Sequence, residues 1–340
     1  TMIRFLEDLT GVNAQKIPLD DPKVMSLFQS TEALGIQPAD IGGVEMGSLG
    51  IPEFGTDFVI QMLKDTKPKA FSDLIRISGL SHGTDVWINN GQEMIRNGLA
   101  TITTVISTRD GIMSYLINKG MEKGLAFTIM ESVRKGKGLK DEWVTAMTAS
   151  DVPEWYIESC RRIKYMFPKA HAAAYVMMAF RIAYFKVYYP LEYYAAYFSV
   201  RASTFDYVVM GKGREVLEEA AQDLKNRADK LTKKEQDMEK EMQTVREMYA
   251  RGFGFHRIDL YQAEATRFKI IDGKIMPSFC SINGMGEKAA LSIVEARKDA
   301  PFLSIEDLIS RTKLSKTLVE ILRVNGILEG LSETNQISLF

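Results

Sequence analysis

The sequence has only two cysteines, no long hydrophobic run and almost no net charge. Cys160 and Cys280 are too few for a disulfide framework and match no metal-binding spacing, so we expect a reducing compartment. The longest apolar run, residues 172–180, is about half as long as a membrane span, and the first residues are too polar for a signal peptide. A net charge of −1 means that any nucleic acid must be held by local basic patches. These absences predict a cytoplasmic protein with no membrane partner.

The sequence also lacks a pair of acidic residues on a predicted strand. Enzymes that use two metal ions for phosphoryl transfer hold those ions with such carboxylates. Asp20 and Asp21 precede a proline and indicate the start of a helix, while Asp8, Asp57 and Asp85 stand alone. We therefore predict no metal site and no catalytic carboxylate in these residues.

Helical periodicity dominates what is present. The 340 residues, 46% of them apolar, allow two or three globular domains. Short helical segments fill most of residues 1–205, a glycine-rich loop interrupts them at 42–55, and strand-like alternation is nearly absent. The chain begins at Thr1 and enters helical periodicity at once, so we expect it to be a piece of a longer protein. The predicted fold is mainly α.

Residues 211–251 carry equal numbers of acidic and basic residues around an apolar heptad. Thr232 and Glu235 have the spacing of a capping box, which predicts that a second helix begins there and that the segment folds back as a helical hairpin. A charged, balanced hairpin is most often a spacer or a solvated face, and we favour that interpretation. The apolar positions include Leu217, Leu224, Leu231, Met238 and Val245.

The C-terminal third contains two turn signals. Asp272-Gly273 between apolar runs predicts a short β-hairpin. Gly284 and Gly286 allow a tight turn before an alanine-rich helix, so that several backbone N–H groups can point at a phosphate diester. Lys288 and Arg297 can add positive charge to such a site. The pattern resembles a helix-hairpin-helix clamp on the DNA backbone, and the alternative is a simple turn between helices.

Residues 76–82 gather Arg76, Ser78, Gly79 and His82 where a helix should end. Arginine and hydroxyl groups suit phosphate or sugar contacts, and small residues allow close backbone approach. The alternative is a helix that ends at glycine with incidental polar caps.

Residues 161–186 interleave cations with aromatic residues. On a helix that begins at Lys169, positions 171, 175 and 178 share one face. A tyrosine beside cations can stack on a base while the cations hold its phosphates; the alternative is a buried aromatic helix, which we prefer for the tyrosines from 184 onward. Burying a cation is costly, so Lys164, Lys169 and His171 should lie on the surface or in a site.

The last five residues read Gln336-Ile337-Ser338-Leu339-Phe340. A tail with one polar anchor and two apolar side chains is a common peptide ligand. The alternative is a frayed end.

In this order, these segments resemble the C-terminal part of the PolC-type DNA polymerase III alpha subunit of low-GC Gram-positive bacteria. The resemblance covers nearly the whole chain, and residues 211–251 are its least specific part. It depends on residues 50–55, 76–85, 133–138, 151–156, 165–175 and 336–340.

The resemblance implies three domains. They are a helical fingers domain at 1–205 that adjoins a palm outside the chain, a duplex-DNA-binding domain at 206–330 with the helical hairpin, β-hairpin and helix-hairpin-helix, and a flexible tail at 331–340. It places Gly284, Gly286, Lys288 and Arg297 on the DNA backbone, and Gln336, Leu339 and Phe340 on the sliding clamp. Asn283 stands where this family's turn should have proline. The residues implied for the incoming nucleotide and the nascent base pair are Arg76, Ser78, Gly79, His82, Arg109, Lys164, Tyr165, Lys169, His171 and Tyr175.

The implied function is that of one part of a DNA-directed DNA polymerase, inactive by itself. The Mg²⁺ ions and the catalytic aspartates would belong to the palm. The implied partners are primer–template DNA, the incoming deoxynucleoside triphosphate, the sliding clamp and other replisome subunits, at the nucleoid. Two alternatives stay open: a non-enzymatic adaptor that bridges duplex DNA and the clamp, and a coiled-coil scaffold built on residues 211–251.

Overall fold

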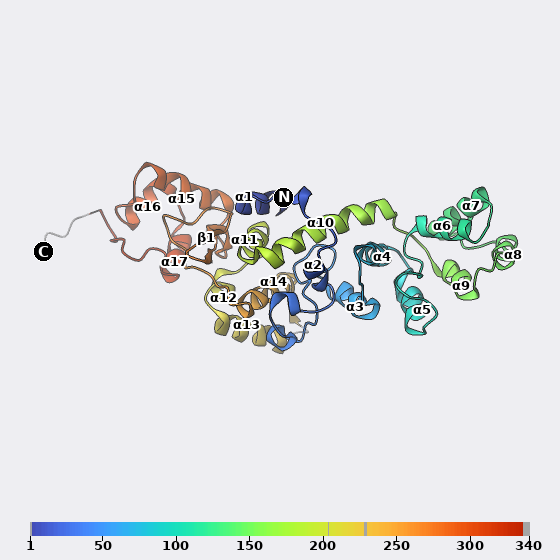
Figure 1. Ribbon diagram of the computed structural model, residues 1–340. Coiled ribbons are helices and arrows are strands. Elements are labelled where there is room, and N and C mark those ends of the chain that lie inside the picture. The colour runs from blue at the N-terminus through green and yellow to red at the C-terminus, as the bar shows by residue number, and fades with distance from the viewer. Residues whose placement is uncertain (1, 203, 228–229, 336–340) are drawn as a thin grey trace. The chain divides into compact units, whose positions relative to one another are not determined.

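The computed structural model describes residues 2–202, 204–227 and 230–335. These residues are mainly helical, with one pair of short antiparallel strands, which confirms the predicted fold class. The elements pack into two compact units, each assembled from segments that are far apart in the sequence (Figure 1). We call residues 1–15, 35–44 and 185–340 the terminal unit, and residues 16–34 and 45–184 the central unit. The functional division at 1–205, 206–330 and 331–340 stays a prediction.

The central unit consists of short helices with local start signals. The Asp21 carboxylate accepts from the Val24 N–H at 2.9 Å, with Pro22 as the first helical residue, as the sequence predicts. Thr56 caps the next helix through its hydroxyl group. The helices are α2 (Pro22–Ser26), α3 (Asp57–Thr66), α4 (Phe71–His82), α5 (Gln92–Arg96), α6 (Arg109–Asn118), α7 (Lys123–Arg134), α8 (Asp141–Ala149) and α9 (Glu154–Arg162), with short turns η2 (Glu32–Leu34) and η4 (Trp87–Gly91).

Aromatic packing joins the ends of this unit's sequence. Phe28 lies between Phe54 and Phe180, at ring-centroid distances of 5.0 and 6.1 Å. Phe71, at the start of α4, meets Phe180 edge-on at 5.6 Å. Phe180 belongs to the long helix α10 (Lys169–Tyr188), which contributes residues to both units. This packing fixes α4 and the first part of α10, which carry seven of the ten residues predicted for the incoming nucleotide and the nascent base pair.

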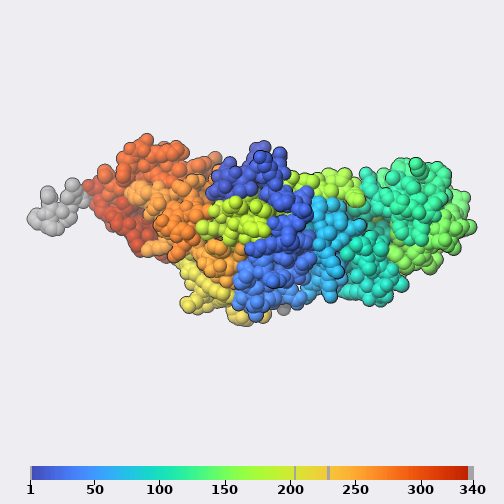
Figure 2. Space-filling model, viewed as in Figure 1, coloured from blue at the N-terminus to red at the C-terminus, as the bar shows by residue number. Residues whose placement is uncertain are grey.

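The terminal unit contains the N-terminal helix and everything after α10. In it α1 packs against α11, and in Figure 2 the yellow-green surface of α11 borders the blue surface of the N-terminal residues. Among the described residues, no helix is long and apolar enough to cross a membrane. The elements are α1 (Met2–Thr10), η1 (Ala14–Lys16, shared with the central unit), η3 (Pro38–Ile41), α11 (Pro190–Val200), α12 (Tyr207–Met210), α13 (Arg214–Asn226), α14 (Lys233–Ala250), β1 (Lys269–Ile271), β2 (Lys274–Met276), η6 (Phe279–Ser281), α15 (Glu287–Asp299), α16 (Ile305–Thr312) and α17 (Lys316–Val324).

Both predicted hairpins form. Asp272 and Gly273 have φ angles of 49° and 72°, the left-handed pair that a two-residue turn between β1 and β2 requires. Helices α13 and α14 pack together, and α14 starts with a capping box. In that box the Thr232 hydroxyl accepts from the Glu235 N–H at 3.3 Å, and the Glu235 carboxylate accepts from the Thr232 N–H at 2.8 Å.

The interpretation of residues 211–251 as a solvated spacer is wrong for the second half of α14. Met242, Val245 and Met248 are buried there, because this half of the helix packs into the core of the terminal unit. The buried apolar residues of this half of α14 are therefore not available as the seam of a coiled coil.

A buried ion pair joins α10 to α14. Lys186 Nζ and Glu247 Oε1 are 2.7 Å apart, and both side chains are completely buried. The Tyr194 hydroxyl donates to the same carboxylate at 2.6 Å, and Arg251 donates to the Lys186 carbonyl oxygen at 3.0 Å. Burial lowers the pKa of Lys186 to about 8, and Glu247 opposes that shift. Although the sequence groups Lys186 with the cations of a candidate site, the structure places it in the core.

Candidate functional site

A cavity of about 250 Å³ in the central unit brings Arg76 and Lys169 together. The Arg76 guanidinium donates to Asp73 Oδ1 at 3.1 Å and to Ser72 Oγ at 3.4 Å, so α4 itself fixes its direction. Lys169 is exposed, and its ammonium group forms no ion pair within the described part of the chain. Hydroxyl and aromatic residues complete the wall, among them Thr103, Thr104, Ser107, Thr108, Tyr115 and Tyr156.

The N-terminus of α6 borders this cavity. Its N-cap residue, Thr108, makes no side-chain capping bond. The Gly111 N–H donates to the Thr108 carbonyl oxygen at 3.1 Å, while those of Arg109 and Asp110 have no acceptor within the described residues. Arg109 is the first helical residue, where a cation opposes the helix dipole unless an anion binds nearby. Asp110 Oδ2 accepts from the Lys169 backbone N–H at 2.9 Å and thereby ties the start of α10 to α6. Two side-chain cations and a helix N-terminus therefore converge on one small cavity.

Ser78 and Gly79 lie on the buried face of α4. A Cβ atom at position 79 would come within 2.6 Å of the Ser107 carbonyl oxygen, so glycine is what lets α4 pack against the segment leading into α6. Ser78 is 2% exposed. Neither residue is among those that line the cavity.

Four rings form a ladder where α4 ends and α10 begins. His82 stacks on Phe167 at 4.7 Å, Phe167 meets His171 edge-on at 5.4 Å, and His171 lies 5.1 Å from Tyr175. His171, Tyr175 and Met178 are all exposed, which confirms the predicted shared face of the helix. The ladder therefore joins three of the predicted residues and ends in an exposed aromatic surface.

Lys164 and Tyr165 precede the ladder on a fixed backbone. The Thr84 N–H donates to the Tyr165 carbonyl oxygen at 2.9 Å, and the Lys164 N–H donates to the Thr84 carbonyl oxygen at 3.1 Å. Gly136 packs against Lys164 so closely that a Cβ atom there would lie 2.6 Å from the Lys164 carbonyl oxygen. The Tyr165 side chain is 47% exposed, and that of Lys164 is also exposed. Both side chains extend from an anchored turn.

Sequence reasoning missed two residues of this region. Phe167 lies within the segment that carries the family resemblance, but its place between the rings of His82 and His171 is seen only in the fold. Glu53 Oε2 lies 3.1 Å from His82 Nε2, but no local pattern connects residues so far apart in the chain. The hydroxyl wall did have a signal, because Thr108 before Arg109-Asp110 is typical of a helix start.

The second candidate site is the turn before α15 in the terminal unit. Gly284 has a φ of 89°, which favours glycine, and Gly286 is the N-cap of α15. The N–H groups of both glycines have no acceptor within the described residues. Lys288 is exposed in the first turn of the helix. The turn thus offers unpaired N–H donors beside a cation, an arrangement that suits a phosphate.

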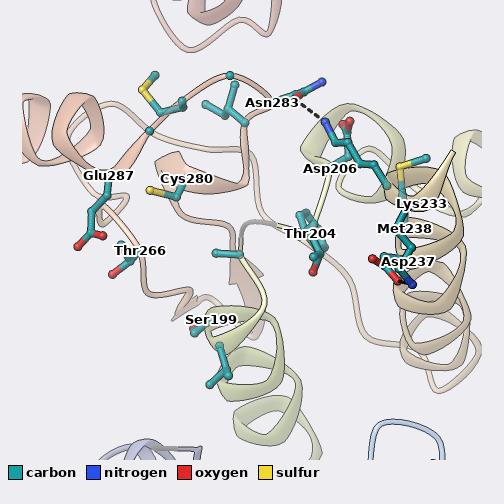
Figure 3. A pocket seen from close by; sticks show the side chains of 18 residues that line it. Ser199, Thr204, Asp206, Lys233, Asp237, Met238, Thr266, Cys280, Asn283 and Glu287 are labelled. Atoms are coloured by element: carbon teal, nitrogen blue, oxygen red, sulfur yellow. Dashed lines mark hydrogen bonds and ion pairs between the residues drawn. The ribbon is translucent and has the colours of Figure 1, made fainter. Parts of the chain in front are cut away.

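This turn forms part of a pocket of about 880 Å³ (Figure 3). Figure 3 shows Asn283 and Cys280 on one side, with Lys233 and Met238 of α14 on the other. Lys234 Nζ donates to Asn283 Oδ1 at 3.1 Å, the contact drawn as a dashed line. Asn283, which stands where proline was expected, is thus held by α14.

Arg297 does not join Lys288 at the turn. Its guanidinium donates to the Leu260 carbonyl oxygen at 2.8 Å, and partial burial lowers its pKa. This contact ties α15 to the preceding loop. Of the two predicted cations, Lys288 is the one whose charge faces solvent.

The predicted clamp-binding residues Gln336, Leu339 and Phe340 lie outside the described residues. Within residues 2–202, 204–227 and 230–335, no group of three or more His, Cys, Asp or Glu residues could hold a metal ion.

Comparison with known proteins finds a family model for part of the chain at each end. Residues 1–151 match the family model of the bacterial DNA polymerase III alpha subunit finger domain, and residues 252–337 match that of the helix-hairpin-helix motif. Over all 340 residues, the chain is 54% identical to the PolC-type DNA polymerase III of Caldanaerobacter subterraneus and 53% identical to those of Clostridium perfringens and Bacillus subtilis. It covers 24%, 23% and 24% of these relatives. The chain is therefore similar, from end to end, to one segment of PolC-type DNA polymerase III, a segment with a finger domain and a helix-hairpin-helix motif.

Proposed function

We propose that this chain is the fingers and duplex-binding segment of a replicative DNA-directed DNA polymerase, acting at the nucleoid in the cytoplasm. It binds the incoming deoxynucleoside triphosphate, the primer–template duplex and the sliding clamp. Other parts of the polymerase supply the catalytic aspartates and the Mg²⁺ they hold. The observation that carries the proposal is the cavity in which Arg76, Lys169 and the α6 N-terminus meet.

The chemistry of this cavity suits a triphosphate. Arginine and lysine form charge-assisted hydrogen bonds to phosphate oxygens, and the N–H groups at a helix N-terminus add further donors. Because Asp73 fixes the direction of Arg76, little side-chain reorganisation is needed when the anion arrives. Arg109 follows the cavity residue Thr108 in the sequence, and Lys164 precedes Lys169 by five residues; both would add positive charge. These residues would align the triphosphate and offset its charge during transfer.

The exposed aromatic side chains suit the base rather than the phosphates. His171 and Tyr175 share an exposed face of α10, and Tyr165 is 47% exposed. Bases of any identity stack on such rings. We assign these three residues to the nascent base pair, and His82 to the support of their rings.

The terminal unit would hold the product. The N–H groups at Gly284 and Gly286, together with Lys288, would bind a backbone phosphate and position the duplex without reading its sequence. The tail residues Gln336, Leu339 and Phe340 would bind the sliding clamp, in the manner of a short peptide with two apolar plugs.

The test is binding to a chain-terminated primer–template, with and without the next correct nucleotide. The correct nucleotide should tighten binding, and Arg76→Ala or Lys169→Ala should weaken the nucleotide effect about tenfold or more. Arg96→Ala is the matched control, since Arg96 is half-exposed and pairs with Asp65 at 3.0 Å on another part of the same unit. Tightening that survives both cavity variants would contradict the assignment of the cavity.

The same experiment tests the alternative that the chain is a non-enzymatic adaptor. A non-enzymatic adaptor would bind duplex and clamp with no response to any nucleotide. The burial of Met242, Val245 and Met248 of α14 within the terminal unit argues against the coiled-coil scaffold.

A further inference from the structure

A further cavity of the terminal unit, of about 530 Å³, gathers three cations. Lys212 lies between α12 and α13, Arg257 follows α14, and Lys274 begins β2, so three separate segments each supply one of them. All three side chains are exposed, and the carboxylate in the described part of the wall is that of Glu329. Three positive groups against one carboxylate, in a chain whose net charge is −1, make this cavity suited to an anion.

The positive charges of this cavity are available to a ligand. Neither Lys212 nor Lys274 forms an ion pair within the described residues, and Lys212 Nζ lies 5.8 Å from the centre of the Tyr207 ring. Arg257 is paired with Glu329 Oε2 at 3.1 Å, but both side chains are about two-thirds exposed. An ion pair in so much solvent contributes little to stability, so the guanidinium can exchange this carboxylate for a phosphate.

Two helix ends border the cavity, and their dipoles do not oppose an anion. Gly213, which lines the wall, is the N-cap of α13 and has no side chain to cap it, so the positive end of that helix dipole lies at the cavity. Helix α17 ends at the same wall, where its carbonyl oxygens would repel an anion. The Ile321 carbonyl oxygen, however, accepts from the Asn325 side chain at 2.9 Å. That of Arg323 accepts from the Gly326 N–H at 2.9 Å.

We propose that this cavity is a second phosphate-binding site of the terminal unit, in which Lys212, Arg257 and Lys274 hold a backbone phosphate of the duplex. The inference rests on the proposed function, because the duplex is assigned there to this unit. Arg257 and Lys274 lie within residues 252–337, which match the helix-hairpin-helix model, but the turn before α15 is not among the described residues of the wall. Because a duplex carries a phosphate about every 1.7 Å along its axis, the turn and the cavity bind different phosphates. Two contacts fix the direction of the duplex across the unit, which one contact cannot do.

The test is the salt dependence of duplex binding by the 340-residue chain. The double variant Lys212→Ala with Lys274→Ala should lower the slope of log affinity against log salt by about one, which weakens binding about tenfold near 0.1 M salt. Lys212→Arg with Lys274→Arg keeps both charges and should keep the wild-type slope. Adding Lys288→Ala to the alanine pair should lower the slope by about one more, because the turn binds its own phosphate.

The matched control is Lys269→Ala with Lys298→Ala, which removes the same charge from the same unit. Lys269 and Lys298 already pair with Glu264 and Glu295, at 3.7 and 2.7 Å, so the slope should not change.

Three outcomes would overturn the inference. If the control lowers the slope as much as the cavity variant does, net charge alone explains the effect. If the cavity variant keeps the wild-type slope while Lys288→Ala lowers it, the cavity does not bind the duplex, and the proposed function stands without it. A titration with a deoxynucleoside triphosphate in the absence of DNA tests the other source of phosphate: if the cavity variant loses only this affinity, the site belongs to a free nucleotide. A wild-type chain that binds no duplex overturns the proposed duplex binding itself.

Discussion

Replacing Lys186 with methionine should destabilise the terminal unit by about 3–5 kcal/mol. Lys186 and Glu247 are both fully buried, and their charged atoms are 2.7 Å apart. Methionine has a similar volume but leaves the Glu247 carboxylate with only the Tyr194 hydroxyl as a donor among the described residues. A buried charge that has lost its partner carries its full desolvation cost, and this cost sets the magnitude.

The double variant Lys186→Met with Glu247→Leu separates the ion pair from general packing. Removing both charges also removes both desolvation costs, so the double variant should be more stable than Lys186→Met alone. Lys233→Met is the matched control, because Lys233 pairs with Asp237 at 3.0 Å on the exposed side of the same helix α14. Its effect on stability should be negligible.

Hydrogen exchange of peptides from α11 and α14, read by mass spectrometry, measures the stability of this unit directly. The three tryptophans, Trp87, Trp143 and Trp155, all belong to the central unit. The urea unfolding curve that their fluorescence reports should therefore be the same in Lys186→Met as in the wild type. A loss below about 1 kcal/mol in Lys186→Met, or a double variant as unstable as the single one, would refute the reasoning.

The same residue predicts a pH dependence. The pKa of Lys186 falls to about 8 in the fold, against 10.5 for an ordinary lysine. Between these values the unfolded chain keeps a proton that the folded chain has released, so this group makes folding more favourable as pH rises through that window. Urea denaturation of the terminal unit should show this rise in the wild type and lack it in Lys186→Met.

Three further predictions concern the other sites. Gly79→Ala should destabilise the central unit by about 1–3 kcal/mol in tryptophan-monitored unfolding, because the new Cβ would lie 2.6 Å from the Ser107 carbonyl oxygen; Gly111→Ala, with its nearest neighbour at 3.6 Å, should not. Lys288→Ala should lower the slope of log affinity for duplex DNA against log salt by about one, whereas Lys298→Ala on the same helix, already paired with Glu295, should not. Deleting Leu339 and Phe340 should abolish binding to the isolated clamp and leave duplex affinity unchanged, so retained clamp binding would contradict the role of the tail.

Local signals in the sequence predict local structure well. The Asp272-Gly273 turn, the Thr232 capping box and the exposed face of α10 each depend on residues no more than seven positions apart. Each follows from backbone geometry that a short peptide already contains. Arg76 and Lys169 could each be recognised as a candidate phosphate ligand from its own charge, without knowing that the two share a cavity.

The partners of these residues could not be predicted, because they come from distant parts of the sequence. Nothing near Lys186 indicates that Glu247 will neutralise it in the core, and nothing near His82 indicates Glu53. The sequence around Arg297 indicates no partner for it, but in the fold its guanidinium donates a hydrogen bond to the Leu260 carbonyl oxygen. Charge alone therefore identifies which residues are able to bind an anion, whereas burial and pairing decide which ones are available.

The way the chain alternates between the two units has a consequence for its synthesis on the ribosome. The central unit is complete once residue 184 has emerged, but α1 must wait for α11 before its buried side chains, Phe5 and Leu6, can be covered. At bacterial elongation rates this delay is on the order of ten seconds. We expect the central unit to fold first during translation, while the N-terminal helix stays accessible to chaperones until the second half of the chain arrives.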